Sequence, residues 1–373
     1  MAMARAYGIV TPAGGHIKVE GMDEFRPISA FSFLGRYRIV DFPVSSMSNS
    51  GIGRIQVYVS QNPRSLAEHL GSGRVYNINS KRGKLQLLFN QDSRVNEIYN
   101  TDIKAYLDNM DVIERMHQPY VVISPGHMVF VQDYHKLLEE HLSSGADVTI
   151  MYHKVNDADV EYRNCSVVNL NRQKGVKSIE QNTGTIAERN IFMDTYVMSN
   201  ELFIKLVHKA HDISSVYRQV DIINAENESL DIRGVQHKGF FATITDFKSY
   251  YDTNMSLLDW NLSQNLFRDE WPIYTQTTDS CPSRYTMDSS VKNSMVANGS
   301  LIEGTVENSI LGRGVHIKKG AVVRNCMILS HAIIEEGVHV ENQVVDKWAQ
   351  IKNIKELVTT PDKPGYVRRN DIL

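Results

Sequence analysis

The chain has 373 residues, of which 42% are hydrophobic and 22% are charged, so it is long enough for two domains with ordinary cores. Its net charge of −3 excludes a broad electrostatic attraction to nucleic acids or anionic membranes. The cysteines, Cys165, Cys281 and Cys326, are far apart and odd in number. They make neither a disulfide framework nor a zinc ligand set, which indicates a reducing, cytoplasmic setting. The N-terminus has no apolar stretch of signal-peptide length, and no run approaches the roughly 18 apolar residues of a membrane helix.

Strand and helix signals alternate over the first part of the chain. The segments 54–60 and 119–124 are apolar runs typical of strands, and 62–73 and 103–116 have helical spacing. Residues 133–155 indicate a helix, a glycine stop and another strand. This alternation predicts an α/β fold with a mainly parallel sheet, in which ligands bind at the carboxyl ends of the strands.

The pattern changes after Pro282, where small or aliphatic residues begin to recur every six positions. The two rows are Val322, Ile328, Ile334 and Val340, and Gly314, Gly320, Cys326, Ala332, Val338 and Val344. A period of six predicts a hexapeptide β-helix, in which three short faces make one coil, and an irregular all-β appendage is the alternative. The register is imperfect, because His316 falls on the first row. We expect the tail, 359–373, to dock as an irregular strand or to stay loose.

These patterns divide the chain into three parts. The expected α/β domain covers residues 1–262, a linker covers 263–288, and the β-helix with its tail covers 289–373.

The segment GRYRIVDFPVSSMSNSGI, 35–52, resembles the stretch that follows the phosphate loop in ADP-glucose pyrophosphorylases, the glucose-1-phosphate adenylyltransferases of glycogen and starch synthesis. Other matching segments fall in the order of this family: PYVVISPGHMVFVQDY (119–134), GADVTIMY (145–152), GFFATITDFKSYYDTNMSLLD (239–259) and WPIYT (271–275). The resemblance covers nearly the whole chain. It implies a nucleotidyltransferase domain with a doubly wound, mostly parallel sheet, followed by a left-handed hexapeptide β-helix that builds a tetramer.

Within the opening segment, Arg36, Arg38 and Asp41 stand close to apolar residues. The resemblance implies that they are structural charges, which pair with each other or with the backbone. Direct contact with a ligand is the alternative.

The family reaction joins glucose-1-phosphate to the α-phosphate of ATP, and this chain departs from the family at the phosphate loop. The family pattern is Gly-Gly-x-Gly-x-Arg-Leu, whereas matching Gly14 and Gly15 to the first glycines places Ile17 at the third glycine and Val19 at the arginine. A match shifted to Pro12 and Ala13 places Ile17 at the arginine instead. On either match, the basic residue that neutralises phosphate charge is lost. The lysine of the family's Lys-Pro-Ala element falls on Ile28, two residues from Arg26, which is the candidate substitute.

Two metal-binding carboxylates of the family are also replaced. The aspartate of Ser-Gly-Asp-His becomes His127, and the aspartate of Gly-Tyr-Trp-x-Asp becomes Thr243. Magnesium prefers oxygen ligands, so His127 is a poor substitute. Asp246 is the nearest carboxylate, and on a strand it would point away from the face of Thr243.

The sugar-phosphate site shows the same trend. Gln181 stands where the family has a lysine, and it supplies a hydrogen bond but no charge. Of the family's Gly-Thr-Ala-Asp-Ala element, 100–105 keeps only Thr101.

These losses favour a regulatory, catalytically impaired subunit that pairs with a catalytic homologue in a mixed tetramer, without a metal or cofactor of its own. Mg²⁺ is expected in the catalytic partner, and neither nucleic acid nor membrane is an expected partner. One alternative is an active adenylyltransferase that uses Arg26, His127 and Asp246. Another is a stand-alone sensor of sugar phosphates or nucleotides. An acyltransferase is a further alternative, because hexapeptide β-helices often carry a catalytic histidine; His316, His331 and His339 are the candidates.

Two clusters remain outside this scheme. Lys81, Arg82 and Lys84 gather in a predicted loop. Two interpretations are open: the loop is simply solvated, or it contacts an anionic effector or another subunit. His208 and His211 stand one helical turn apart, which is a metal-ligand spacing, but without a third ligand they favour a solvated helix face.

Overall fold

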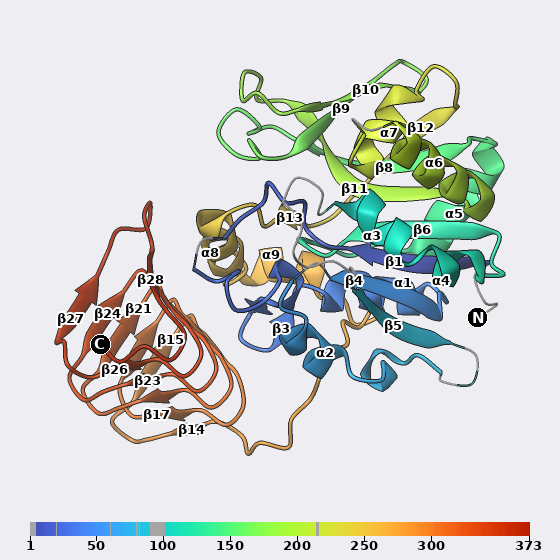
Figure 1. The fold of residues 1–373 in the computed structure, drawn as a ribbon. Coiled ribbons are helices and arrows are strands. Elements are labelled where there is room, and N and C mark those ends of the chain that lie inside the picture. The colour runs from blue at the N-terminus through green and yellow to red at the C-terminus, as the bar shows by residue number, and fades with distance from the viewer. Residues whose placement is uncertain are drawn as a thin grey trace.

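The computed structural model describes residues 5–19, 21–59, 61–79, 81, 83–89, 101–213 and 216–373. An α/β domain is followed by a left-handed β-helix, as expected (Figure 1). Helices α8 and α9 lie between the main sheet and the β-helix in this view.

The α/β domain contains these elements: β1 (Ala6–Thr11), a 3-10 helix (Ile28–Ala30), β2 (Ser32–Phe33), β3 (Tyr37–Arg38), α1 (Asp41–Asn49), β4 (Arg54–Val59), α2 (Arg64–Leu70), a second 3-10 helix (Arg74–Tyr76), β5 (Lys84–Phe89), α3 (Asp102–Asp108), α4 (Met110–Glu114), β6 (Tyr120–Pro125), β7 (Met128–Phe130), α5 (Tyr134–Ser144), β8 (Val148–Val155), β9 (Ser166–Leu170), β10 (Val176–Gln181), β11 (Arg189–Ser199), α6 (Asn200–Asp212), α7 (Gln219–Ala225), β12 (Ile232–Gln236), β13 (Phe241–Thr243), α8 (Phe247–Ser256) and α9 (Trp260–Leu266).

The main sheet has the order β10-β9-β11-β6-β1-β4-β5, and β12 joins it through β8, which pairs with β11. Strands β6, β1, β4 and β5 are mutually parallel, and β12 is parallel to β8. Strand β11 runs antiparallel to β6, β8 and β9, which the sequence did not predict. The short connection between β9 and β10 accounts for their antiparallel pairing, since a parallel neighbour needs a crossover of a dozen or more residues.

Helices cover both faces of the sheet, as in a doubly wound domain. Helices α1, α2 and α5 pack into one core cluster, and α3, α4, α6 and α7 pack into the cluster on the opposite face. Strand β1 serves both clusters, because Val10 faces the first and Ile9 the second. The carboxyl ends of the central strands therefore open at one edge of a buried sheet.

Arg38 and Asp41 of the opening segment hold structural contacts, as the resemblance implied, whereas Arg36 is exposed. The Asp41 carboxylate accepts hydrogen bonds from the Arg38 amide at 2.8 Å and the Tyr76 hydroxyl at 2.6 Å, and it lies 2.6 Å from His69 Nε2. Arg38 donates to the Ser65 carbonyl at 2.5 Å. These contacts join the start of α1 to α2 and to the second 3-10 helix.

The β-helix is built from three parallel faces. Their strands are β14 (Arg284–Tyr285), β15 (Ser290–Lys292), β16 (Met295–Val296), β17 (Leu301–Ile302), β18 (Thr305–Glu307), β19 (Ile310–Leu311), β20 (His316–Ile317), β21 (Val322–Arg324), β22 (Met327–Ile328), β23 (Ile333–Ile334), β24 (His339–Glu341), β25 (Gln343–Val345), β26 (Gln350–Ile351), β27 (Glu356–Val358) and β28 (Gly365–Val367). Each face stacks five strands in the described residues.

The spacing of six holds only in part. Ile328, Ile334 and Val340 point inward as predicted, but Val323 rather than Val322 fills the core. Val323 pairs with Val340 and Val340 with Leu357, so each of these coils takes 17 residues. One face per coil is therefore a residue shorter than the other two. For the same reason Gly314 and Gly320, which the sequence placed in a row with Cys326, lie at turns with φ of 67° and 72°.

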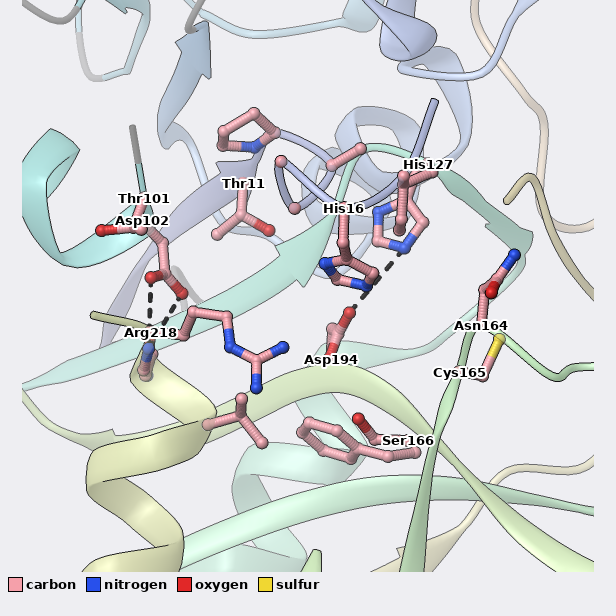
Figure 2. Close-up of a pocket in the computed structure, with 18 of the residues that line it drawn as sticks. Thr11, His16, Thr101, Asp102, His127, Asn164, Cys165, Ser166, Asp194 and Arg218 are labelled. Atoms are coloured by element: carbon pink, nitrogen blue, oxygen red, sulfur yellow. Dashed lines mark hydrogen bonds and ion pairs between the residues drawn. The ribbon is translucent and has the colours of Figure 1, made fainter. Parts of the chain in front are cut away.

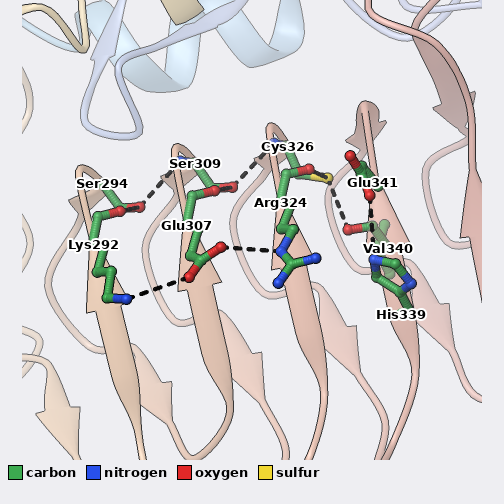
Figure 3. Close-up of polar contacts among 9 residues, drawn as sticks. All are labelled: Lys292, Ser294, Glu307, Ser309, Arg324, Cys326, His339, Val340 and Glu341. Atoms are coloured by element: carbon green, nitrogen blue, oxygen red, sulfur yellow. Dashed lines mark hydrogen bonds and ion pairs between the residues drawn. The ribbon is translucent and has the colours of Figure 1, made fainter.

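Polar contacts tie neighbouring coils together on the face formed by β15, β18, β21, β24 and β27 (Figure 3). Glu307 bridges Lys292, at 3.8 Å, and Arg324, whose Nε lies 3.0 Å away. At the adjoining corner, the Ser309 hydroxyl accepts from the Cys326 amide at 3.0 Å. These ion pairs are exposed or half-exposed, so they contribute little to the free energy of unfolding. Their main effect is to fix the register between neighbouring coils.

Several boundaries differ from the sequence expectation. Helix α9 crosses residue 262, and β14 begins at Arg284, inside the expected linker. The predicted helix 103–116 is divided into α3 and α4 at Asn109, whose side chain donates to the Ala105 carbonyl at 2.9 Å. The tail docks as strand β28, and Gln350 forms a further parallel bridge with Ile372.

The face of the β-helix that is formed by β16, β19, β22, β25 and β28 packs on the α/β domain. One core cluster joins Tyr250 and Tyr251 of α8 and Leu266 of α9 to Ile310 and Met327 of the β-helix. This shared core fixes the β-helix against the domain that carries the candidate site.

Candidate functional site

A cavity of about 710 Å³ opens where the central strands end (Figure 2). Thr11 at the end of β1, His127 just after β6 and Asp194 on β11 line it. Asp102 at the start of α3 and Arg218 just before α7 complete the polar lining on the other side. The position agrees with the rule that open α/β sheets bind ligands outside the carboxyl ends of their strands.

The loop after β1 lines the cavity, but its lysine, Lys18, borders a neighbouring space instead. Gly14 and Gly15 border the cavity, as predicted for a vestigial phosphate loop. Val19, which aligns with the family arginine, is fully buried in the core, and Ile17 is buried beside it. A Cβ on Gly14 would lie 2.7 Å from the ring of His16, so the glycine allows this imidazole to fold over the loop. Burial, with the charge of Arg218, lowers the pKa of His16.

His127 lies in the cavity wall as a neutral group. Its side chain is 3% exposed, and its Nε2 is 3.8 Å from Asp194 Oδ2. Burial lowers its pKa to about 3, with a smaller contribution from His16, so the imidazole carries no charge at neutral pH. Its Nδ1 is buried and has no hydrogen-bond partner in the described residues.

Thr243 and Asp246 do not restore the missing metal ligands. Thr243 is buried at the end of β13, opposite Met128 of β7, and it does not line the cavity. Asp246 lies beyond the strand, contrary to the geometry expected from the sequence. It is the N-cap of α8 and accepts from the Ser249 amide at 2.7 Å, so its carboxylate is engaged in the helix start.

Neither Arg26 nor Ile28 lines the cavity. Arg26 is buried and pairs with Asp346 of the β-helix. Ile28 is buried in the first 3-10 helix and borders a neighbouring space of about 1070 Å³, which shares Gly14 and Gly15 with the cavity. Arg26 therefore cannot replace the family lysine, because its guanidinium is committed to the domain boundary.

Gln181 is placed as predicted, at the cavity. It is the last residue of β10, and its Nε2 donates to the Arg163 carbonyl at 3.0 Å. Thr101 also lines the cavity, as the N-cap of α3.

Sequence reasoning missed Asp194, which occupies an unusual place. It lies at a register shift of β11 between Phe192 and Tyr196, with a φ of 43°. Such a bulge re-aims a side chain, and the left-handed backbone is strained for a residue other than glycine. Burial and the charge of Asp102 raise the pKa of Asp194 to about 7. A lone aspartate within the apolar run NIFMDTYVM was the available signal.

Asp102 and Arg218 were also missed. The Asp102 carboxylate accepts from the Gln219 amide, with both oxygens at 3.1 Å, and burial raises its pKa to about 6. Arg218 holds Asp221 through two hydrogen bonds, of 3.1 and 2.8 Å. The one arginine among the described lining residues is therefore already paired.

The other predicted clusters lie away from the cavity. Lys81 is exposed, Arg82 lies outside the described residues, and Lys84 begins β5 rather than lying in a loop. His208 and His211 are exposed on α6, in agreement with a solvated helix face.

The residues present do not fit a magnesium ion. In the described part of the chain, no three His, Cys, Asp or Glu side chains are grouped so that they could hold a metal. The positions expected to carry carboxylates offer an imidazole and a buried hydroxyl instead. The candidate histidines of an acyltransferase are likewise engaged: His316 lies 2.7 Å from Glu303, His339 lies 3.4 Å from Glu341, and His331 stacks on Trp348.

Two family models match the chain. Residues 25–234 match the model "Nucleotidyl transferase", and residues 281–362 match "GlmU-like, C-terminal hexapeptide". The chain therefore belongs to the nucleotidyl transferase family, with a hexapeptide β-helix appended.

Its relatives narrow this assignment. The chain is similar to the glycogen biosynthesis protein GlgD of Geobacillus stearothermophilus, at 33% identity over 82% of this chain and 79% of the relative. It is 29% identical to GlgD of Bacillus subtilis, over 92% of this chain and 90% of the relative. Glucose-1-phosphate adenylyltransferase of Clostridium perfringens (strain 13 / Type A) is 28% identical, over 82% of this chain and 78% of the relative. These relatives place the chain in the family of glucose-1-phosphate adenylyltransferases and GlgD proteins.

No helix in the described part of the chain combines the length and apolar character that crossing a bilayer requires.

Proposed function

We propose that this chain is a regulatory, catalytically impaired subunit of glucose-1-phosphate adenylyltransferase. In this role it modulates a catalytic homologue that makes ADP-glucose from ATP and glucose-1-phosphate for glycogen biosynthesis in the cytoplasm. The similarity to GlgD, a glycogen biosynthesis protein by name, supports the pathway.

The observation that carries the proposal is the chemistry at the two expected metal positions. His127 is a buried imidazole whose pKa of about 3 keeps it neutral, and Thr243 is buried away from the cavity. Arg26 and Asp246, the substitutes that an active enzyme would need, are engaged at the domain boundary and at the start of α8. Metal ions and phosphate cations each stabilise such a transition state by several kcal/mol, so their joint loss leaves little turnover.

The partner in this proposal is the homologous catalytic subunit, which supplies the magnesium site. A mixed tetramer is the proposed assembly, and self-association is the competing arrangement. A partner that prefers one conformation of the catalytic subunit shifts its population, and a difference of about 1 kcal/mol changes an equilibrium about fivefold.

A stand-alone sensor is the second candidate function, and the retained cavity supports it. A scaffold without ligands would gain stability from filling such a space with apolar side chains, yet the cavity keeps polar groups without partners. A regulatory subunit can also bind a ligand. The regulatory subunit and the stand-alone sensor therefore differ only in whether the chain needs a catalytic partner to function.

The test uses the purified chain with and without its catalytic homologue. Alone, with ATP, glucose-1-phosphate and Mg²⁺, it should form no ADP-glucose above background. Mixed with the homologue, it should change the homologue's maximal rate, substrate affinity or effector response a few-fold, and a homologue without its two metal aspartates should give an inactive complex. Turnover by the chain alone within about tenfold of a typical 10 s⁻¹ would overturn the proposal.

A further inference from the structure

A second space opens away from the cavity, between helices α8 and α9 and one corner of the β-helix. Its volume is about 640 Å³, and it shares no described lining residue with the cavity. Asn293, Asn308 and Asn325, which follow β15, β18 and β21, line it from the β-helix. Trp260, the first residue of α9, lines it from the α/β domain. We call this space the asparagine groove.

The three asparagines of the groove recur once per coil. The residues before them pair in register, Lys292 with Glu307 and Glu307 with Arg324 (Figure 3). The asparagines therefore follow one another at the spacing of neighbouring strands, about 4.8 Å. Their φ angles are 41°, 46° and 48°, a left-handed conformation that asparagine adopts more readily than most residues. The turn of the coil explains why asparagine stands here, but it does not use the amide groups.

Most of these amide groups are available to a bound molecule. Asn293 Nδ2 donates to Asn308 Oδ1 at 2.8 Å. In the described residues, Asn308 Nδ2 and both polar atoms of the Asn325 side chain have no hydrogen-bond partner. The next corner asparagine, Asn342, is buried and donates to the Thr359 carbonyl at 2.5 Å. The row of available amides therefore ends after three coils, where the groove also ends.

Trp260 faces the solvent to an unusual degree. It is 73% exposed, whereas Trp348 is 52% exposed, and tryptophan is highly buried on average in folded proteins. Trp260 belongs to none of the hydrophobic clusters formed by the described residues, so the core does not need its indole. An indole offers a flat apolar face and one N–H donor, which together make a good contact surface for a ligand.

The groove is held open by the contact between the two domains. The Tyr251 hydroxyl of α8 donates to the Asn325 carbonyl at 2.6 Å. Met255 and Leu258, which also line the groove, pack against the core cluster that joins α8 and α9 to the β-helix. The indole and the row of amides are therefore fixed relative to each other before any ligand binds.

The chemistry of the groove favours an uncharged ligand rich in hydroxyl groups. Among its described lining residues only Asp259 is charged, and this carboxylate accepts from the Leu262 amide at 3.0 Å to cap α9. No lysine or arginine is among these residues to hold a phosphate. Amides both donate to and accept from hydroxyl groups, and an aromatic face packs on the C–H face of a sugar ring. A row that repeats once per coil suits a ligand that repeats as well.

We propose that the asparagine groove binds an uncharged chain of linked hexoses. One ring stacks on Trp260, and hydroxyl groups of neighbouring rings form hydrogen bonds with Asn308 and Asn325. The binding needs this chain alone. Its consequence, that the subunit is held on the polymer whose synthesis it regulates, rests on the proposed function.

The experiment is a calorimetric titration of the full chain with maltoheptaose and with cellohexaose, which are linear glucose chains of different linkage. Glucose is the single-ring probe. We expect at least one of the two chains to bind with a Kd of about 1 mM or tighter, and glucose to bind at least about tenfold more weakly, because one ring reaches only part of the groove. The chain that binds reports the preferred linkage.

Variants of the groove test the assigned residues. Trp260→Ala should weaken binding of the hexose chain at least about tenfold and leave the urea midpoint unchanged, because the indole is exposed. The double variant Asn308→Gly, Asn325→Gly removes two amides and tolerates the positive φ, and it should also weaken binding about tenfold. The matched control is Trp348→Gly, which removes another exposed indole at a positive φ outside the groove and should leave the affinity unchanged.

Four results would overturn the inference. The first is no binding of either hexose chain at concentrations of about 10 mM. The second is an unchanged affinity in folded Trp260→Ala and in the folded double variant. The third is binding of glucose as tight as that of the chain, which would indicate a single-ring site elsewhere. The fourth is association with the catalytic homologue that Trp260→Ala abolishes while neither hexose chain binds, which would assign the groove to a protein contact.

The binding test and the regulatory test can fail separately. Regulation of the homologue is measured without any hexose chain, so its failure leaves the binding result standing. Failure of the hexose chains to bind likewise leaves the regulatory proposal standing.

Discussion

Arg26 of the α/β domain and Asp346 of the β-helix form an ion pair between residues 320 positions apart in sequence. Their side chains are 3% and 0% exposed, and the Tyr366 hydroxyl donates to the same carboxylate at 2.7 Å. A buried pair contributes little compared with apolar residues of the same volume, but removing one partner leaves an uncompensated buried charge. This pair therefore makes the docked position of the β-helix specific.

Replacing Asp346 should destabilise the whole chain. Asp346→Ala leaves Arg26 buried without a counter-charge and should lower the free energy of unfolding by about 3–5 kcal/mol, measured by urea denaturation. Glu68→Gln is the control, because it breaks the exposed pair Arg64–Glu68, whose side chains are 92% and 64% exposed. That change should cost less than about 1 kcal/mol. Equal losses in the two variants would contradict this role for Arg26.

Replacing Asp194 should stabilise the chain, more so at high pH. Its pKa of about 7 in the folded state lies above the 3.8 of an ordinary aspartate, so the folded state holds the proton more tightly. The stability linked to this proton is present below pH 3.8 and is lost as the pH rises through 7. Asp194→Asn should therefore gain stability relative to the parent chain from pH 5 to pH 8, as the urea midpoint would show. A gain that does not depend on pH would show that the proton on Asp194 is not its cause.

His127 should make the chain sensitive to acid. Its folded-state pKa of about 3 lies below the 6.5 of an ordinary histidine, so its contribution to stability is present above pH 6.5 and is lost as the pH falls towards 3. The slope can reach about 1.4 kcal/mol per pH unit for a single group. His127→Asn should flatten the fall of the urea midpoint between pH 6.5 and pH 4. His208→Asn, at an exposed histidine of α6, should leave that fall unchanged.

Restoring two carboxylates should not restore catalysis. The double variant His127→Asp, Thr243→Asp should form no ADP-glucose with ATP, glucose-1-phosphate and Mg²⁺, because Ile28, Gln181 and the missing loop arginine leave the phosphates without cations. A direct assay of product is the measurement, with a catalytic homologue as the positive control. Measurable synthesis would show that the phosphate contacts survive in another form.

The regular elements were the predictable part of this structure. The strands β4 and β6 follow from short apolar runs, and α5 follows from its spacing and its glycine stop, because burial imposes these periods locally. Two features could not be predicted from a short window of sequence. They are the antiparallel placement of β11 and the division of α3 from α4, which depend on chain connections and helix caps. The 17-residue coil was missed because a period of six ignores the one shorter face.

The site was predictable in its location but not in its chemistry. Gly14, Gly15, His127 and Gln181 line one cavity, since the family order of segments fixes where each strand ends. Asp194 could not be predicted as a cavity residue, because its orientation depends on the bulge in β11 and on its positive φ. The prediction for Arg26 failed because its partner, Asp346, comes from the opposite end of the chain.

The coil length decides which changes of length the β-helix can accept. A single inserted residue in the turn at Gly337 would move Val340, Val345 and Ile351 off the inner columns and turn apolar side chains towards water. Removing or adding 17 residues, one whole coil, would instead return every later strand to its column and keep its pairing with the coil before it. Insertions and deletions among these 17-residue coils are therefore tolerated in whole coils, whereas an earlier coil, in which Ser290 pairs with Thr305, closes with 15 residues.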